Sequence, residues 1–464
     1  MFDFPIFEMP VIGQRMLMAI NAIIHVFVSH GGAVGGSIVL AALAIWANKR
    51  NDMNAYNMTY KILMVFFIIT TSIGALTGIG MWIHANILSP NAIGGLIRVF
   101  FWKWFIEWIV FNFEVILLLV WFMTWKKHAD SPQGRARSIK FGVSYAVASW
   151  LTMVIITAIL AFMLTPNFAG QPWVDPEVFP GKVDYNNALF NPTWGPSLAF
   201  RTTSAIAFAA ALAIMWTWII ATFSKNPDDM DAKPRVIKFL AGIMLIMVPV
   251  SAVLGYWYLS IIPDAAKAMI PTAMMTRAFE DKFDVMYMIT IGIGATVLIT
   301  TIIAYFAPKR MPYVAASMMV LAFLAFWGYE ERVREFIRKP YIIYNYMYSN
   351  GIRATDVPYL NKVGILKHAV FIDEDKKVLN ADKSNIVEVG HSIFQIECRI
   401  CHTDNGINGL KKLTKGWSQE AIRARLNNLP GGGTPYMPPF VGTDADKDAL
   451  AAYLHSLNKE GVIK

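Results

Sequence analysis

Eight long apolar stretches dominate the hydrophobic and polar pattern of the first 330 residues. They lie roughly at 14–47, 58–85, 97–125, 141–165, 198–223, 236–262, 284–306 and 311–330. Each is near or above the about 20 residues that a helix needs to cross the hydrocarbon core of a bilayer. The pattern therefore predicts an all-α fold built on a polytopic transmembrane bundle of about eight spans, with residues 1–330 as one membrane domain.

The pattern changes after residue 330, where charged and polar residues become frequent. Residues 331–385 are polar and rich in tyrosine, and we expect a linker that lies along the membrane surface. Residues 386–464 predict a small, separate α-helical domain. Three domains are therefore expected: the membrane bundle, the linker and the C-terminal domain.

Two helices are expected to frame this C-terminal domain. Gly390, Phe394 and Cys398 recur every four residues, which predicts a short helix with these residues on one face. Thr443 is a good N-cap for a final helix over residues 446–457 that carries Tyr453. A glycine that faces an aromatic side chain allows the two helices to cross closely.

Composition supports a membrane protein. The chain is 56% hydrophobic and only 16% charged, whereas soluble domains carry about 25% charged residues. Residues 1–13 contain no Lys or Arg, so the basic region of a cleavable signal peptide is missing. The sequence shows no basic face with interspersed aromatic residues, so nucleic-acid binding is not predicted.

The distribution of Lys and Arg predicts the orientation in the membrane. The odd-numbered connections hold fourteen, namely Lys49, Arg50, Lys61, Lys126, Lys127, Arg135, Arg137, Lys140, Lys225, Lys233, Arg235, Lys238, Lys309 and Arg310. The other connections hold five, namely Arg98, Lys182, Lys267, Arg277 and Lys282. Positive charge is concentrated on the cytoplasmic side of membrane proteins. The N-terminus and the C-terminal domain are therefore both expected outside.

A Cys-x-x-Cys-His run, Cys398 to His402, contains the only two cysteines of the chain. Its spacing suits two thioether bonds to one haem, with His402 as an iron ligand. A zinc half-site would need two more soft ligands, and a thioredoxin-like pair would need a βαβ context. The tail shows neither, so covalent haem c is the favoured interpretation. Such attachment takes place outside the bacterial plasma membrane, in agreement with the charge distribution.

The second axial ligand of this haem is expected to be Met437. It lies in Pro435-Tyr436-Met437-Pro438-Pro439, where the prolines stiffen the loop that carries a weak thioether ligand. The alternative for Met437 is a packing methionine. The segment resembles a class I cytochrome c domain, which implies one-electron transfer at a raised potential.

Ionisable residues inside the apolar stretches are the other candidates for function, because each is costly in a bilayer unless it is paired or ligated. His25 lies within the first span and is a candidate haem ligand; the alternative is a hydrogen-bonded core histidine. Glu107 and Glu114 on the third span are seven residues apart, so they point to one side of the helix. The alternative for this pair is an ion pair with Lys103 or Arg201.

Several motifs over roughly residues 14–341 resemble subunit I of the cytochrome bd oxidase family. They are Arg15 to Gly36 around His25, Gly74-Ala75-Leu76-Thr77-Gly78, the acidic pair of the third span, Phe190-Asn191-Pro192 and Glu335-Phe336-Ile337-Arg338-Lys339-Pro340-Tyr341. The resemblance implies that His25 and Glu335 ligate haem iron and that Glu107 and Glu114 lie by the haems and a proton path. The acidic spacing is seven here, against eight in the family.

The chain also departs from that family. The fifth-span histidine that ligates the low-spin haem is replaced by Thr202, although its partner methionine survives as Met288. The long quinol-binding loop of the family shrinks to about residues 263–283. The family's ninth helix is missing, and the cytochrome c domain stands in its place.

Together these features predict a haem oxidoreductase subunit of the bacterial inner membrane. It is expected to take electrons from a periplasmic carrier through haem c and to pass them to b-type or d-type haems, with dioxygen as the acceptor. A second bd-like or other membrane subunit is the expected partner. The alternatives are an electron-transfer and anchor subunit without an oxygen-reducing site, and a quinol-linked reductase working in reverse.

Overall fold

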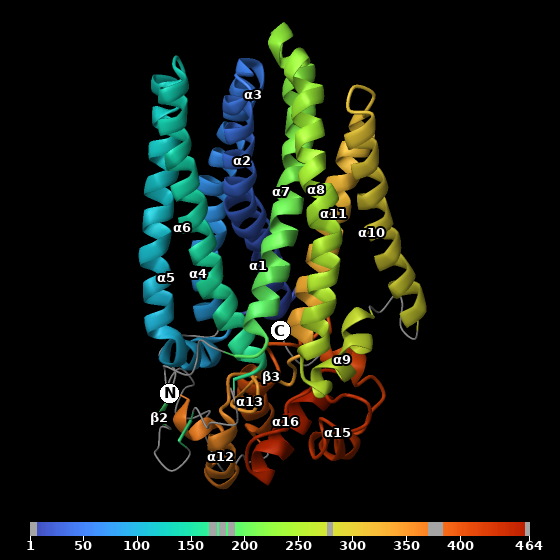
Figure 1. Cartoon of the computed structure of the whole chain (residues 1–464). Helices are drawn as coiled ribbons and strands as arrows, with labels where there is room; N and C mark the ends of the chain where they lie inside the picture. Colours follow the sequence, from blue (N-terminus) through green and yellow to red (C-terminus); the bar gives the residue numbers. More distant parts are fainter. Residues whose placement is uncertain are drawn as a thin grey trace.

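The computed structural model describes residues 7–166, 174–175, 182–183, 191–275, 282–369 and 384–459. Within these residues eight helices are long and apolar enough to cross a membrane, which confirms the predicted number. They run side by side, and the smaller C-terminal helices gather at one end of the bundle (Figure 1). The spans are α1–η1–α2 (Gln14–Lys49), α3–η2–α4 (Met53–Leu88), α5 (Pro90–Thr124), α6 (Pro132–Leu164), α7 (Trp194–Phe223), α8 (Pro227–Ile261), α10 (Phe283–Phe306) and α11 (Tyr313–Phe336).

Two of these spans contain π-helical segments. The first span consists of α1 (Gln14–Val26), η1 (Phe27–Gly35) and α2 (Gly36–Lys49). The second consists of α3 (Met53–Ile69), η2 (Thr70–Gly74) and α4 (Ala75–Leu88). The two π segments contact each other. Such segments are rare and are often found near functional sites.

Several helices begin well before the apolar stretches from which they were predicted. α6 begins at Pro132 and α8 at Pro227, in polar sequence. In each case proline occupies the first turn, and the preceding Ser131 or Asn226 accepts a hydrogen bond from a free backbone N–H. Proline and a capping side chain both favour a helix start. The helices therefore extend beyond the hydrocarbon core.

The centre of the bundle is packed with small residues. α7 contributes a run of fully buried alanines that includes Ala205, Ala209 and Ala213. A Cβ on Gly35 of η1 would lie 2.1 Å from the carbonyl oxygen of Ala205. Only glycine allows the backbones of η1 and α7 to approach so closely, as is common between membrane helices.

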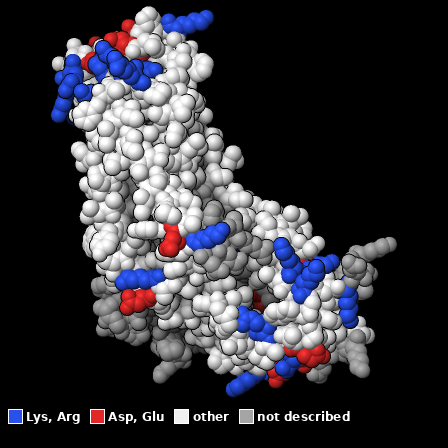
Figure 2. Space-filling view, turned by 90° about the vertical axis from the view of Figure 1, so that its right-hand side faces the viewer, with Lys and Arg blue, Asp and Glu red and all other residues white. Residues whose placement is uncertain are grey.

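Ion pairs connect the helices at the end of the bundle that carries the odd-numbered connections. Lys61 on α3 contacts Asp229 on α8 at 2.5 Å, and Arg235 on α8 contacts Asp52 at 2.7 Å. Charged side chains gather at this end and at the opposite end, with an uncharged belt between them (Figure 2). This belt is the face expected of a protein embedded in lipid.

The rest of the described chain lies mainly at the opposite end. The short elements there are β1 (Val174–Asp175), β2 (Lys182–Val183), α9 (Asp264–Met274), β3 (Tyr341–Ile343), β4 (Met347–Tyr348), η6 (Ala354–Asp356), α12 (Val357–Val363) and η7 (Leu366–His368), whereas η3 (Lys126–His128) lies in the third connection. β1 pairs with β2 and β3 pairs with β4, both antiparallel. Part of the predicted linker is thus folded; its residues 370–383 lie outside the described residues, as does Phe190.

The C-terminal domain consists of α13 (Ile386–Glu397), α14 (Leu410–Leu413), α15 (Gln419–Leu426) and α16 (Asp444–Ser456). α13 and α16 cross as predicted, since a Cβ on Gly390 would lie 2.0 Å from the carbonyl oxygen of Ala449. α16 begins at Asp444, two residues before the predicted start. Thr443 and Asp446 form a reciprocal capping box, so Asp446 is the third helical residue.

The core of this domain includes residues from the preceding segment. Ile352, Leu360 and Leu366 are buried in the same cluster as Ile393 and Leu450. Asn361 also accepts a hydrogen bond from the backbone N–H of Gly442 at 2.9 Å. The segment before residue 370 therefore helps to fix the C-terminal domain.

Candidate functional site

The Cys-x-x-Cys-His run forms a tight turn at the end of α13. The backbone N–H groups of Cys401 and His402 donate to the carbonyl oxygen of Cys398 at 3.1 and 2.9 Å. Both cysteines are half-buried and are not joined in a disulfide. Burial raises the pKa of the Cys398 thiol well above its ordinary value. The turn thus presents both sulfur atoms and the imidazole from one short segment, which suits covalent haem attachment.

Asn408 fixes the orientation of His402. The Nδ1 atom of His402 lies 3.0 Å from the carbonyl oxygen of Asn408, so it is the protonated nitrogen that donates to this oxygen. The Asn408 amide in turn donates to the carbonyl of Cys401 at 2.8 Å. Burial lowers the pKa of His402, which favours the neutral ring. Nε2 is then left to bind iron, as in other metal-ligating histidines, and the residues fit a haem.

Arg425 on α15 holds the loop that carries Met437. Its guanidinium donates to the carbonyl oxygens of Asn428, Leu429 and Gly431 at 2.6, 2.9 and 2.9 Å. It also donates to the hydroxyl of Thr434, whose carbonyl accepts the backbone N–H of Met437 at 3.0 Å. Nothing in the local sequence pointed to Arg425, because the loop that it holds has no regular spacing.

The methionine loop contacts the end of the last span. The Tyr436 ring lies 5.2 Å from that of Phe336 on α11, between ring centroids. The guanidinium of Arg15 on α1 lies 5.7 Å from the centroid of the same Phe336 ring. Phe336 therefore joins the C-terminal domain to the helix that carries His25.

Charged residues surround Phe336 at this junction. Glu335 pairs with Arg338 and, at 3.4 Å, with Lys339. Burial has the largest effect on Lys339 and lowers its pKa. Glu335 raises this pKa, Arg15 lowers it and the Cys401 thiol raises it, each by a smaller amount. Lys339 is thus a direct partner of the candidate membrane ligand Glu335.

His25 lies against the second span. Its Nδ1 atom is 3.1 Å from the hydroxyl of Thr77, and a Cβ on Gly78 would lie 3.3 Å from its Cε1 atom. Both partners belong to the Gly-Ala-Leu-Thr-Gly motif that the sequence singled out. The hydrogen bond orients the ring and leaves Nε2 as the nitrogen for a metal. The alternative, a hydrogen-bonded core histidine, uses the same contact.

Glu114 is buried and satisfied by hydroxyl groups of α6. Ser149 donates to its Oε1 at 2.8 Å and Thr152 to its Oε2 at 3.1 Å. Glu107 lies half-buried two turns earlier on α5. Arg201 pairs with acidic residues of α11 instead, so the alternative ion pair between Arg201 and this acidic pair is wrong.

Sequence reasoning missed a buried charge cluster between α7 and α11. Arg201 donates to Glu331 at 2.9 Å and lies 3.7 Å from Glu330, while Arg334 donates to Glu331 at 2.8 Å. His30 of η1 completes the cluster, with Nδ1 at 3.4 Å from the Arg201 Nη1 atom. His30 thus contacts Arg201 of α7, whereas His25 contacts Thr77 of α4. The only signal was the string of charges after residue 329.

Thr202 and Thr203, where the resemblance implies a low-spin haem site in the family, make polar contacts with neighbouring helices. Thr202, in place of the family's histidine, accepts a hydrogen bond from the Trp150 indole at 3.1 Å. One residue on, Thr203 bonds with Ser251 of α8 at 2.8 Å. Met288 lies on α10 with 63% of its surface exposed. The residues here do not fit a histidine- and methionine-ligated haem.

Comparison with known families separates the chain into two matched regions. The family described as cytochrome bd terminal oxidase subunit I matches residues 14–282. The family described as cytochrome c oxidase, cbb3-type, subunit III matches residues 385–454. Both agree with the resemblances found in the sequence.

A solved structure supports the fold of the membrane region. The chain is similar to a bd oxidase from Geobacillus thermodenitrificans, with a TM-score of 0.54 and 16% sequence identity. The alignment covers 70% of this chain and 85% of the other. Among curated proteins, no sequence matches this chain.

Proposed function

Since the chain belongs to the family of cytochrome bd terminal oxidase subunit I and carries a cytochrome c domain, we propose that it receives electrons at haem c and passes them to membrane haems that reduce dioxygen. Its domains make it a membrane oxidoreductase that transfers electrons, with haem c and b- or d-type haems as the implied cofactors. When bound, haem c supplies one-electron transfer and a high-spin membrane haem supplies oxygen reduction.

The observation that carries this proposal is the junction at Phe336. Tyr436, beside the candidate ligand Met437, and Arg15, on the helix of His25, contact the same ring at 5.2 and 5.7 Å. Both candidate haem sites thus lie against one small set of side chains, which supports electron transfer within the chain.

The residues of the membrane domain have distinct roles in this proposal. His25 and Glu335 hold haem iron, and Thr77 orients His25. Glu114 and Glu107 deliver protons, since carboxyl groups held inside a membrane protein commonly mark proton paths. Ser149 and Thr152 keep Glu114 in place without neutralising it, because hydroxyl donors leave the carboxyl group free to exchange a proton.

Haem c is proposed to replace the family's electron entry from quinol. Thr202 is held by Trp150 where the family has a haem ligand, and the loop after α8 is short. In this part of the chain α9 (Asp264–Met274) is tied to α11 by Arg332, which donates to the carbonyl of Ala273 at 3.1 Å. Met288 would not serve as a ligand in its exposed position.

Orientation and partners follow from charge and exposure. The excess of Lys and Arg in the odd-numbered connections supports a cytoplasmic location for that end and a periplasmic location for the C-terminal domain. The second and third spans have only 17% of their apolar windows buried. A second membrane subunit covers part of this surface, lipid covers the rest, and a periplasmic electron carrier donates to haem c.

Purified protein tests the proposal through its haems and its oxygen uptake. We expect haem c together with a CO-binding high-spin haem, and oxygen uptake driven by reduced cytochrome c. His25→Ala should abolish CO binding and leave haem c intact, whereas Thr77→Val should keep the haem and shift its spectrum. A protein with no CO-reactive haem would refute the proposal.

A second candidate function is an electron-transfer and anchor subunit without its own oxygen site. It is favoured by the hydrogen bond between Trp150 and Thr202, which stands in place of a haem ligand. The direct contact of His25 with Thr77 and Gly78 also favours it. The haem count separates the two candidates. One haem per chain, all of it c-type by its pyridine haemochrome, would support the anchor subunit.

A further inference from the structure

The N-terminal segment Phe7–Gly13 lies between the bundle and the haem-binding segment, residues 395–407. On the bundle side, the backbone N–H of Phe7 donates to the carbonyl oxygen of Ile87 on α4 at 3.2 Å. The side-chain amide of Gln14 on α1 donates back to the carbonyl of Phe7 at 3.1 Å. The segment is therefore tied to the ends of the first two spans.

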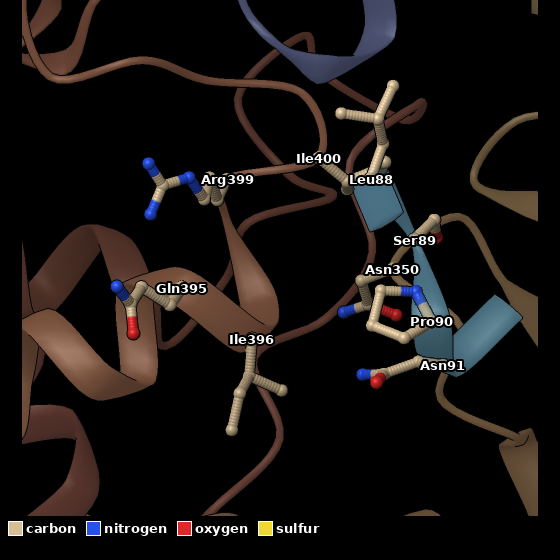
Figure 3. A pocket seen from close by; sticks show the side chains of 9 residues that line it. All are labelled: Leu88, Ser89, Pro90, Asn91, Asn350, Gln395, Ile396, Arg399 and Ile400. Atoms are coloured by element: carbon tan, nitrogen blue, oxygen red, sulfur yellow. The ribbon is translucent and has the colours of Figure 1, made fainter. Parts of the chain in front are cut away.

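Glu8 makes the polar contact with the haem-binding segment. Its Oε1 atom accepts hydrogen bonds from the Gln395 amide at 2.9 Å and from the Arg399 guanidinium. Arg399 lies between the two cysteines and is only 6% exposed. Gln395 and Arg399 lie together on one side of the junction, and Pro90 lies on the other (Figure 3). Glu8 thus binds the segment at Gln395 and Arg399, just before His402.

The backbone of Phe7–Gly13 contacts the haem-binding segment on the other side of His402. The N–H of Ile407 donates to the carbonyl of Val11 at 2.8 Å. Gly406 lies directly beneath this contact, since a Cβ there would lie 2.2 Å from the same carbonyl oxygen. Gly13 likewise packs against the methyl group of Thr403. Only glycine at 406 allows so close an approach.

The junction is completed by the turn between α4 and α5. Leu88, Ser89 and Pro90 face Ile396 and Ile400 across a cavity of about 20 Å³, which is the space of about one water molecule (Figure 3). Apolar side chains from the two parts of the chain therefore face each other at this junction.

We infer that Phe7–Gly13 is a clamp that holds the haem-binding segment at a fixed distance from the membrane helices, with Glu8 and Gly406 as positioning residues for internal electron transfer. The inference rests on the proposed function for its purpose. Its contacts grip the chain on both sides of His402, so they set the place of haem c itself. The rate of electron transfer depends steeply on distance, so loosening the clamp slows the transfer without altering either haem.

The test uses full-length protein with Glu8→Ala and the charge swap Glu8→Arg with Arg399→Glu. Asp448→Ala is the control, because its carboxylate is as exposed as that of Glu8 (48% of each side chain) but pairs with Arg423, away from the junction. Three quantities are measured: hydrogen exchange of residues 395–407, the midpoint potential of haem c, and electron transfer to haem c after CO photolysis of the half-reduced protein.

Glu8→Ala should raise exchange of the segment and slow the electron transfer by about 3- to 10-fold, because a lost charged hydrogen bond lowers the docked population by about this factor; the measured potential separates this effect from the change in local charge. The charge swap should restore both. Exchange and rate equal to those of Asp448→Ala would overturn the inference, as would a swap that restores neither. Absence of CO-reactive haem refutes the proposed function instead, and the exchange data then decide on the clamp alone.

Discussion

Replacement of Arg425 by alanine should release the methionine loop of the cytochrome c domain. The guanidinium is the shared donor for three carbonyl oxygens of the loop and for the Thr434 hydroxyl. Thr434 in turn accepts the backbone N–H of Met437. Arg425→Ala leaves all four acceptors without this donor, so the thioether of Met437 loses its fixed position.

The size of the effect follows from these contacts. A hydrogen bond of this kind contributes about 1 kcal/mol net, and the loop is partly exposed, so water replaces part of the loss. We therefore expect the closed loop to lose about 2 kcal/mol, which is about a 30-fold shift toward the open loop. If the loss falls on the reduced, methionine-ligated form, the potential of haem c falls by about 90 mV.

Redox titration and the absorption band of methionine-ligated ferric haem measure this outcome. Arg423→Ala is the control, because Arg423 lies on the same helix but contacts Asp448 and Asp444 at the surface. Arg425→Lys should recover only part of the potential, since a lysine amine cannot reach all four acceptors in one plane. An unchanged band and potential in Arg425→Ala would refute the reasoning.

Three further predictions concern packing, protons and pH. Gly390→Val should unfold the cytochrome c domain or lower its stability by about 3 kcal/mol or more, because its side chain meets the Ala449 carbonyl; haem absorbance on heating measures this. Glu114→Gln should lower oxygen uptake by about 10-fold or more with the haem content unchanged, by analogy with lost proton donors. The hydrogen bond from Arg399 holds the pKa of Glu8 below its ordinary value, so docking is strongest while this carboxyl is ionised and should weaken as the pH falls through its lowered pKa; Glu8→Gln should flatten this dependence in hydrogen exchange.

Much of the architecture could be predicted from local sequence. The eight spans and the haem-binding run each depend on residues close together in the chain, and α13 and α16 each show their own local spacing or cap. Hydrophobic length and fixed spacing act over a few turns, so they leave a visible pattern. The helix ends were less well predicted, because capped polar turns at Pro132 and Pro227 carry the helices beyond the apolar stretches.

The contacts that organise the site could not be predicted in this way. Glu8 and Arg399 are 391 residues apart, so no local spacing predicts their hydrogen bond. The last span was predicted to end at residue 330, but Arg201 and Arg334 neutralise Glu331 and α11 continues to Phe336. Burial of a charge depends on its partner, which hydropathy along one stretch cannot reveal.

The π-helical segment η1 gives the first span a rotational offset between its two histidines. His25, just before it, contacts Thr77 of the second span, and His30, within it, contacts Arg201 of the fifth. Deleting one residue from η1 would restore an α-helix and turn one half of the span by about 100° relative to the other. The two histidines could then no longer meet their partners at once. The π-helical segment thus lets one span present a histidine to the second span and another to the fifth.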